Sequence, residues 1–322
     1  MHVPSTRRQI RSPLILICAA VIFLLCCIWL LSRQKCNTVS TPSAAAMEAA
    51  QDTSNIVDHL IEGATLKETS LLRLRACLVL ELHYSRLVPS SKFNTDKLNK
   101  CIRNYLRLSD GSFERFHMGR FGEIKYFLPL SRNFTESDCR WLTIGIGGDD
   151  NVEKEFKEKY SECLLYGIEP NKKDHAGFSK YGTVIPHAVG TSNINGYIYE
   201  TAMLKIEPLS KLLDTYAKSR FIHYASLDIE GFEYTLLRSM QKGGTIHREN
   251  VVICQMDVEL HSHHGGSLVS SNFDLSDFLK EFFLRSPYTP VLFSHFLSHV
   301  KMTAIRTDVP ECREAFDWDR YV

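Results

Sequence analysis

Apolar and polar positions alternate along part of the chain in blocks that predict a strand, a helix and a second strand. The apolar run from Trp141 to Ile146 is typical of a buried strand. The charged stretch from Val152 to Tyr160 carries apolar residues at helical spacing, and Cys163 to Ile168 is a second apolar run of strand length. We therefore expect a βαβ unit, in which a helix joins two parallel strands.

A glycine-rich turn joins the first of these strands to the helix. Gly145, Gly147 and Gly148 lie where the chain leaves the strand, and glycine lets the backbone turn tightly and approach a ligand closely. Glu169 ends the second strand about 20 residues later, where nucleotide-binding βαβ units place an acid on the ribose. The pattern predicts a nucleoside cofactor held by the three glycines and Glu169. The alternative is a structural glycine turn with Glu169 in solvent.

Two aspartates narrow the choice of cofactor. Asp149 and Asp150 stand at the N-terminus of the expected helix, where a dinucleotide would place its pyrophosphate. Two carboxylates repel phosphate, but they tolerate a cationic nucleoside that has none. S-adenosylmethionine fits this description, with Glu169 accepting hydrogen bonds from its ribose hydroxyls.

The alternation continues to the C-terminus and predicts one α/β domain over residues 140–322. Further strands are expected at 183–188, 197–201, 221–228 and 251–258, helices at 209–217, 232–240 and 275–284, and a closing antiparallel pair at 291–296 and 300–306. Strands that alternate with helices predict a mostly parallel sheet covered on both faces.

A helical prelude is expected before this domain, over residues 55–139. Its helices at 55–87 and 97–108 would pack on the α/β domain or form an oligomerisation face, and 113–130 is expected to be irregular with one strand.

The N-terminus contains an uncharged apolar run at 14–31, long enough to cross a bilayer as a helix. Arginines precede it, which predicts a cytosolic tail at 1–13 and a luminal remainder, in the Golgi or the endoplasmic reticulum. Residues 32–54 are rich in Ser, Thr and Ala and predict a flexible stem. A cleaved signal peptide is the alternative. Asn133, in Asn-Phe-Thr, is a candidate glycosylation site if this part is luminal.

Charge and cysteine content exclude some classes of function. The net charge of +1, without a basic stripe, gives no reason to expect nucleic-acid binding. No Cys-x-x-Cys spacing occurs, so we expect no structural zinc site. In an oxidising lumen, some of the cysteines that follow the apolar run should form disulfides.

Acidic residues cluster at the ends of two predicted strands. Asp228 and Glu230 end one strand, and Asp257, Glu259 and His261 end the next. On an extended strand, residues two apart share a face, so each set should point to one side of the sheet edge where open α/β sheets hold ligands. Such groups can bind a metal, orient a hydroxyl or act as a general base. The alternatives are a helix cap for the first pair and a solvated loop for the second set.

Several segments together resemble one family. The matching pieces are Gly145-Ile146-Gly147-Gly148, Gly167-Ile168-Glu169-Pro170-Asn171, Ala188-Val189-Gly190, Ala225-Ser226-Leu227-Asp228-Ile229-Glu230-Gly231-Phe232-Glu233 and Gln255-Met256-Asp257-Val258-Glu259-Leu260-His261. The chain resembles S-adenosylmethionine-dependent methyltransferases of the FkbM type, in a nematode-like, membrane-anchored form. The resemblance covers roughly residues 140–322, and Thr143 stands where the family's first motif usually carries an acid.

The resemblance implies a seven-stranded Rossmann-like methyltransferase sheet and an O-methyltransferase acting on a hydroxyl of a sugar or small molecule. We assign catalytic roles to Asp228, Glu230 and His261, and no metal. The cofactor would be held by a set of residues made up of Gly145, Gly147, Gly148, Glu169 and Asp228. The alternatives are a Golgi-type metal-dependent glycosyltransferase and a degenerate methyltransferase fold that serves as a binding module.

Overall fold

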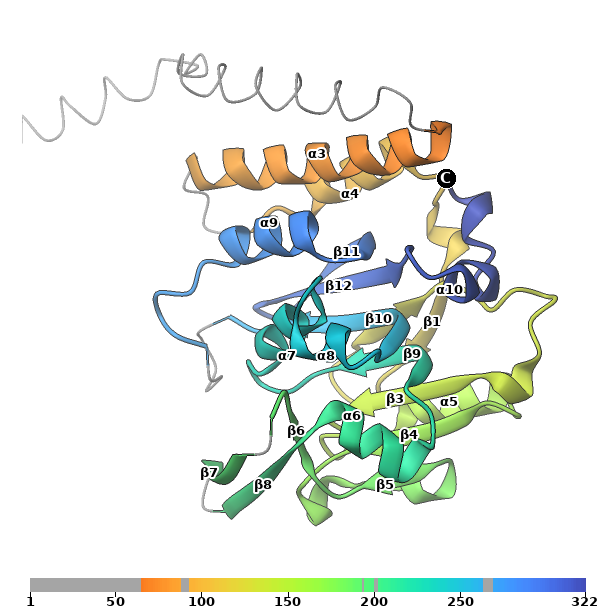
Figure 1. The fold of residues 1–322 in the computed structure, drawn as a ribbon, viewed down its shortest axis with the longest axis vertical. Helices are drawn as coiled ribbons and strands as arrows, with labels where there is room; N and C mark the ends of the chain where they lie inside the picture. The colour runs from red at the N-terminus through yellow and green to blue at the C-terminus, as the bar shows by residue number, and fades with distance from the viewer. Residues whose placement is uncertain (1–64, 88–92, 193, 200–201, 263–268) are drawn as a thin grey trace, which may run out of the picture. The chain divides into compact units, whose positions relative to one another are not determined.

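The computed structural model describes residues 65–322, except 88–92, 193, 200–201 and 263–268 (Figure 1). The predicted cytosolic tail, membrane segment and stem lie outside the described residues. Within the described part of the chain, no helix combines the length and apolar character needed to cross a membrane.

Seven strands form the central sheet, in the order β11-β12-β10-β9-β3-β4-β5 (Figure 1). Their bounds are β3 Arg140–Ile144, β4 Leu164–Ile168, β5 Thr183–Ile185, β9 Phe221–Leu227, β10 Val252–Leu260, β11 Tyr288–Phe296 and β12 His299–Arg306. Neighbours from β5 to β10 are parallel, whereas β12 is antiparallel to both β10 and β11. This confirms the predicted Rossmann-like sheet with a closing antiparallel pair.

The order of the strands creates a switch point between β3 and β9. The chain runs outward from β3 to β4 and β5, then returns to β9 on the other side of β3 and continues to β10. Because such crossovers are right-handed, α5 (Asn151–Lys159) and α7 (Glu233–Met240) cover opposite faces of the sheet. Asp228 N donates to Ile144 O at 3.0 Å, so the carboxyl ends of β9 and β3 lie side by side. Open α/β sheets bind ligands at such a point.

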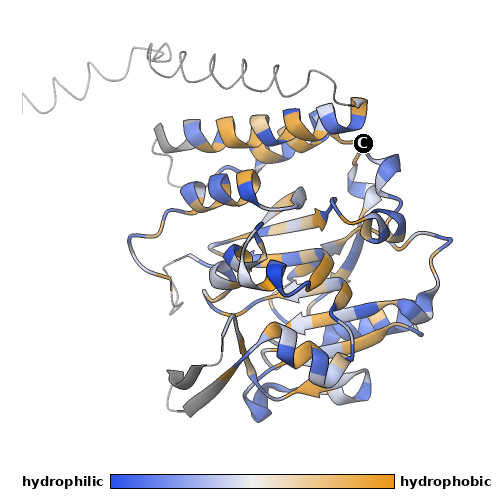
Figure 2. Cartoon of the chain, in the orientation of Figure 1, coloured by the Kyte–Doolittle hydropathy of each residue, from blue (hydrophilic) through white to orange (hydrophobic). Residues whose placement is uncertain are grey.

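The core beneath this point is aromatic and apolar. Trp141 on β3 lies 4.4 Å from Phe156 of α5, measured between ring centroids, and Phe156 lies 5.1 Å from Tyr224 of β9. All three side chains are fully buried. Figure 2 shows apolar residues concentrated in the central strands, as the apolar runs of the sequence predicted.

Two N-terminal helices cover the β11 edge of the sheet. α3 (Leu66–Leu87) buries Leu74, Leu78 and Leu82, which recur every four residues and share one helical face. α4 (Thr95–Tyr105) lies between α3 and β11, and the Asn99 side chain both donates to Phe293 O and accepts from Phe293 N. α9 (Leu275–Arg285) packs beside α3. The apolar face of the prelude is therefore covered within the chain.

Smaller elements complete the fold, and some differ from the prediction. The supposedly irregular stretch before β3 forms a two-stranded antiparallel sheet, β1 (Glu114–His117) and β2 (Ile124–Phe127). A strand that the sequence analysis missed, β8 (Ala202–Pro208), pairs with β6 (Ala188–Gly190) and β7 (Ile194–Tyr199). The remaining short helices are α6 Leu209–Leu212, α8 Thr245–Arg248 and α10 Pro310–Ala315.

Three disulfides join cysteines that the sequence could not pair. They are Cys77–Cys101, Cys139–Cys163 and Cys254–Cys312. The first links α3 to α4, the second joins the residues just before β3 and β4, and the third links β10 to α10. Cys36 lies outside the described residues.

Candidate active site

The glycine turn after β3 has the backbone shape that its sequence predicted. Gly145, Gly147 and Gly148 have φ values of +90°, +60° and +80°, a region that L-residues rarely adopt. A Cβ atom on Gly145 would lie 1.9 Å from the carbonyl oxygen of Asp228. The glycine turn and the end of β9 are therefore in direct backbone contact, which no larger residue at 145 would permit.

Glu169 supports this turn from the end of β4. Its Oε2 accepts from Gly147 N at 3.3 Å and its Oε1 accepts from Asn171 N at 2.9 Å. The residue is 8% exposed, and burial raises the pKa of Glu169 despite these two backbone hydrogen bonds. Each carboxylate oxygen has a second lone pair that can accept a hydroxyl proton. This pair of acceptors, beside an exposed glycine turn, fits the ribose of S-adenosylmethionine.

The two aspartates lie just after the turn, as predicted. Asp149 Oδ1 accepts from Gly119 N and Asn151 N, each at 3.1 Å, so this carboxylate ties the β1–β2 loop to the first residue of α5. Asp150 occupies the N-cap position of α5 without a side-chain cap bond. Their effect on a phosphate group stays a prediction.

Thr143 faces the helix and not the glycine turn. Its Oγ1 donates to Glu153 Oε1 of α5 at 2.5 Å and accepts from Trp141 Nε1 at 2.7 Å. Glu153 is buried, and burial raises the pKa of Glu153 to about 7 despite the hydrogen bond from Thr143. Glu153, a buried acid on α5, therefore lies directly beside Thr143, the position at which the family's first motif usually carries an acid.

Asp228 and Glu230 converge on His261, although not for the predicted reason. β9 ends at Leu227, and Glu230 has a φ of +54°, so the pair lies in a turn and not on an extended strand. Asp228 Oδ1 lies 3.6 Å and Glu230 Oε2 lies 3.4 Å from His261 Nε2. The N-cap position of α7 is Phe232, without a side-chain cap bond, so neither acid is the helix cap that was the alternative.

Glu233, a residue to which the sequence analysis assigned no role, contacts His261 through hydrogen bonds and fixes its position. Glu233 is fully buried, and its Oε2 accepts from Gly231 N at 2.8 Å. Its Oε1 accepts from His261 N at 2.9 Å and lies 3.2 Å from His261 Nδ1. An acid in the first turn of a helix usually faces solvent, and nothing in the spacing marks this one as buried.

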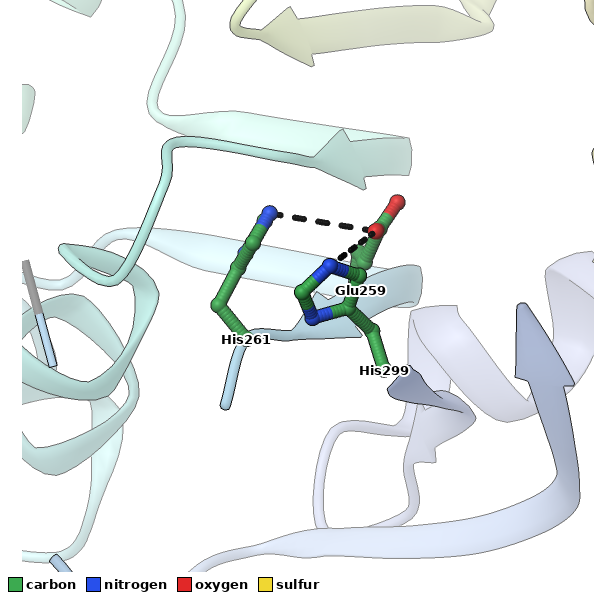
Figure 3. Close-up of side chains that lie close together, drawn as sticks. All are labelled: Glu259, His261 and His299. Atoms are coloured by element: carbon green, nitrogen blue, oxygen red, sulfur yellow. Dashed lines mark ion pairs between the residues drawn. The ribbon is translucent and has the colours of Figure 1, made fainter. Parts of the chain in front are cut away.

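Glu259 and His299 complete the cluster (Figure 3). Glu259 Oε1 lies 3.8 Å from His261 Nε2 and 4.0 Å from His299 Nε2, and the two imidazole centroids are 4.5 Å apart. Ser262 N donates to His299 Nδ1 at 3.3 Å. His299 begins β12, and only the antiparallel pairing of β12 with β10 brings it here. The sequence carried no signal for it.

Crowding shifts the ionisation of these groups. Burial raises the pKa of Glu259 to about 8, and the charge of Asp228 adds to the effect. Burial alone would lower the pKa of His261, but its hydrogen bond to Glu233 and the charges of Glu233, Asp228 and Glu259 raise that pKa to about 9. Burial likewise raises the pKa of Glu230.

Asp257, expected at the same site, lies one layer deeper. Its Oδ1 is 3.2 Å from Lys301 Nζ, and Lys301 also donates to Glu123 Oε1 at 2.7 Å. Lys125 Nζ lies 2.6 Å from the same Glu123 oxygen. Burial would raise the pKa of Glu123, but Lys125 and Lys301 together lower it. His263 and His264, which follow this strand end in the sequence, lie outside the described residues.

Two halves thus meet at the carboxyl edge of the sheet. The cofactor half consists of Gly145, Gly147, Gly148 and Glu169. The acidic half consists of Asp228, Glu230, Glu233, Glu259 and His261. The contact between Gly145 and Asp228 joins them, so a nucleoside cofactor on the first half would lie beside the carboxylates of the second.

Comparison with known proteins agrees with this arrangement. Residues 108–283, more than half of the chain, match the family model described as Methyltransferase FkbM domain. No curated protein gives a significant match.

Several solved structures match the chain at low TM-scores and low identity. One is a putative caffeoyl-CoA O-methyltransferase from Staphylococcus aureus, with 9% identity and a TM-score of 0.32 over 79% of this chain and 99% of that one. Another is M. capricolum TrmK in complex with S-adenosyl-homocysteine, with 11% identity and a TM-score of 0.31 over 55% and 68%. A third is a fibrillarin–Nop5p complex, with 13% identity and a TM-score of 0.34 over 55% and 77%. Similarity at this level says nothing about substrate.

Proposed function

The chain belongs to the methyltransferase FkbM domain family and uses S-adenosylmethionine, and we propose that it is a membrane-anchored O-methyltransferase that acts on a hydroxyl of a sugar or small molecule. The observation that carries this proposal is the backbone contact between Gly145 and Asp228. It places carboxylates that can handle a hydroxyl proton next to the turn that would hold the methyl donor. The family supports methyl transfer, so the glycosyltransferase alternative has no comparable support.

The cofactor half would hold S-adenosylmethionine, which supplies an electrophilic methyl group on a sulfonium. Glu169 would accept from the two ribose hydroxyls, and the exposed glycines would let the backbone approach the nucleoside. Thr143 does not count against this, because its side chain bonds to Glu153 within the fold and leaves the turn free.

The acidic half would position the acceptor. Asp228 is about one-quarter exposed and Glu230 about half exposed, so both carboxylates can reach a substrate hydroxyl. Asp228 would orient the hydroxyl, and Glu230, whose pKa is raised by burial, would take its proton as the oxygen is methylated. Most of the rate would come from holding the oxygen in line with the methyl group.

The membrane anchor and the luminal location are part of the proposal. The apolar run at 14–31 and the arginines before it motivate the anchor. Three disulfides support an oxidising compartment, and Asn133 lies exposed in a turn where a glycan could be attached. In this topology, residues 1–13 are cytosolic and the domain at 140–322 is luminal.

The proposal is tested with full-length protein and isotopically labelled S-adenosylmethionine. Label should pass to hydroxyls of simple methyl glycosides or of glycans released from secretory proteins. Asp228→Asn should lower this transfer by a factor of about 10² to 10⁴, the usual worth of general acid–base and positioning groups. Binding of S-adenosylhomocysteine, measured by calorimetry, should remain close to that of the wild type.

Glu155→Gln is the matched control, because Glu155 is a carboxylate of α5 that bonds to His117 and Asn151 outside the site. It should leave transfer unchanged. Full activity in Asp228→Asn would reject the role of the acidic half. Binding of UDP-sugar with Mn²⁺ in place of S-adenosylhomocysteine would reject the proposed reaction.

A further inference from the structure

We propose that Asp228, Glu259 and His261 form a binding site for a divalent cation at the carboxyl edge of the sheet. The sequence analysis named metal binding as one role that these acids can have, but it assigned no metal. The structure gives a reason to assign one, because two largely buried polar groups face one another without a hydrogen bond.

The first of these groups is His261 Nε2. The His261 side chain is 3% exposed, and its Nδ1 is turned toward the buried Glu233 carboxylate. Among the described residues, no hydrogen bond reaches Nε2, although three carboxylate oxygens surround it at 3.4, 3.6 and 3.8 Å. A histidine that binds a metal commonly donates its other ring N–H to a carboxylate in this way, which fixes the ring, and the ion takes the place of the proton on the remaining nitrogen.

The second group is the Glu259 carboxylate. It is 5% exposed and, within the described part of the chain, makes no hydrogen bond; its nearest nitrogens belong to His261 at 3.8 Å and His299 at 4.0 Å. A largely buried carboxylate whose nearest partners are two imidazoles beyond hydrogen-bond distance can accept a further partner. Figure 3 shows Glu259 directed at both imidazoles.

The distances suit a shared ion. Two ligand atoms that each lie about 2.1 Å from one cation are about 3.0 Å apart at a 90° angle and about 3.8 Å apart at 130°. The oxygens of Asp228 and Glu259 lie 3.6 and 3.8 Å from His261 Nε2, which is too long for a hydrogen bond and within this range. Asp228 and Glu259 bring one oxygen each within 4.8 Å of one another and of Glu123, and a bound ion would draw the first two to within about 4.2 Å, twice the ligand distance.

His299 acts as an orienting residue and not as a ligand. Because Ser262 N donates to its Nδ1, a neutral His299 carries its proton on Nε2, the atom that faces Glu259. Glu233 thus orients one ligand, His261, through hydrogen bonds, whereas His299 faces the other ligand, Glu259, at 4.0 Å. A hydrogen bond from His299 would form if the Glu259 carboxylate moved toward it.

The charge around the site also favours a cation. Lys125 and Lys301 contact Glu123 and Asp257, and Glu123 in turn brings one oxygen within 4.8 Å of the Asp228 and Glu259 carboxylates. The carboxylates nearest His261 have no lysine or arginine within ion-pair distance among the described residues. They are Asp228, Glu230, Glu233 and Glu259.

The ligand set indicates the type of ion. Two carboxylates and one imidazole suit Mn²⁺ or Mg²⁺, which prefer oxygen ligands and keep open positions for water or substrate. The role of the ion rests on the proposed function: an acceptor hydroxyl that binds the cation would lie beside Glu230, which remains free to take its proton.

Mn²⁺ alone is the probe, added to full-length protein and followed by electron paramagnetic resonance. We expect saturable binding, with electron spin echo modulation from one ¹⁴N nucleus of a coordinated imidazole. His261→Gln should abolish that modulation, and Glu259→Gln should weaken binding by roughly 100-fold or more. His299→Gln should weaken binding by roughly 10- to 100-fold and leave the modulation in place. Glu155→Gln, outside the site, should change neither.

Three outcomes would overturn the inference. They are no saturable binding by the wild type, binding without ¹⁴N modulation, and Glu259→Gln binding as tightly as the wild type. S-adenosylhomocysteine binding by the same variants shows whether they are folded. If the substitutions at the buried His261 or Glu259 prevent folding, His299→Gln still tests the site, because His299 is the most exposed of these three side chains.

The inference and the proposed function fail in different ways. Methyl transfer that survives chelation in a protein that does not bind Mn²⁺ would reject the cation site alone. A protein that binds Mn²⁺ as described, but neither binds S-adenosylhomocysteine nor transfers methyl groups, would reject the proposed function alone.

Discussion

The two halves of the site differ in composition, because backbone forms most of one and side chains form the other. The cofactor half is made of backbone: three glycines at positive φ and one carboxylate that accepts from two backbone N–H groups. The acidic half is made of side chains from two separate segments, 228–233 and 259–261, which contact one another. The first half is fixed by local geometry, whereas the second exists only when β9 and β10 are correctly paired.

This difference has a consequence for stability and function. A backbone-built site tolerates no change at its turn but leaves the ionisation of its groups nearly independent. A side-chain cluster couples its groups, so changing one carboxylate alters the charge state of the others. Variants in the cofactor half should therefore act on folding and cofactor affinity, and variants in the acidic half should act on turnover and ion binding.

The largest expected effect is that of Gly145→Ala. The new Cβ would clash with the Asp228 carbonyl oxygen, and a φ of +90° is unfavourable for alanine. Strain and overpacking together should lower the free energy of unfolding by about 3 kcal/mol or more. Urea unfolding measures this, and Gly243→Ala is the control, since Gly243 also has a positive φ, +80°, but has open space around it. Equal losses in the two variants would show that the contact with Asp228 does not matter.

Glu153→Gln should change how stability depends on pH. The pKa of Glu153 is about 7 in the folded protein against an ordinary 4.5, so the folded state binds more protons between these values and stability falls as pH rises through this window. At 1.36 kcal/mol per pKa unit, the loss is about 3 kcal/mol above pH 7. Urea unfolding at pH 4.5 and pH 8 should show the variant gaining about this much relative to the wild type. A constant difference between the two proteins would contradict a raised pKa at Glu153.

Glu169→Ala should weaken cofactor binding. It removes two acceptors for the ribose, each worth roughly 1.5–3 kcal/mol, so affinity for S-adenosylhomocysteine should fall at least about tenfold in calorimetry. Mn²⁺ binding should be unchanged, because Glu169 belongs to the other half. Unchanged S-adenosylhomocysteine affinity, with an intact circular dichroism spectrum, would reject the assignment of Glu169.

The smallest effect on stability is expected for Glu230→Gly. Glycine relieves the left-handed backbone at φ +54°, partly offset by its greater freedom in the unfolded chain, for a net gain of about 0.5 kcal/mol. Methyl transfer should nevertheless fall by a factor of about 10² or more, because the proton acceptor is gone. Glu230→Gln keeps the strain, so it should lose the same activity without gaining stability. Retained transfer in both variants would remove Glu230 from the mechanism.

The same contrast explains what the sequence could predict. The order of strands and helices and the glycine turn followed from apolar periodicity and from Gly145, because these are local properties. Glu169 was predicted at the end of its strand, and β4 indeed ends at Ile168. The missed strand β8 alternates apolar and polar residues after Met203, but the proline at its end was assigned to the following helix.

The acidic half could be predicted only in part. Asp228, Glu230 and His261 were identified from their places at strand ends, and the structure brings them together. Glu233 and His299 were not, because their roles depend on the packing of α7 and on the pairing of β12 with β10. Glu123 and Lys125 come from a stretch with no clear periodicity, and only the tertiary structure places them beneath the cluster.

The order in which the cysteines pair has a consequence for how the disulfides form during synthesis. Each described cysteine pairs with the next one along the chain, at separations of 24, 24 and 58 residues, so no linkage encloses or crosses another. A chain that is oxidised while it emerges from the ribosome, N-terminus first, presents each of these cysteines to its correct partner before the next pair appears. Among these six cysteines, correct linkage then follows from the order of synthesis. A host that oxidises the growing chain is therefore the natural source of protein for every experiment above.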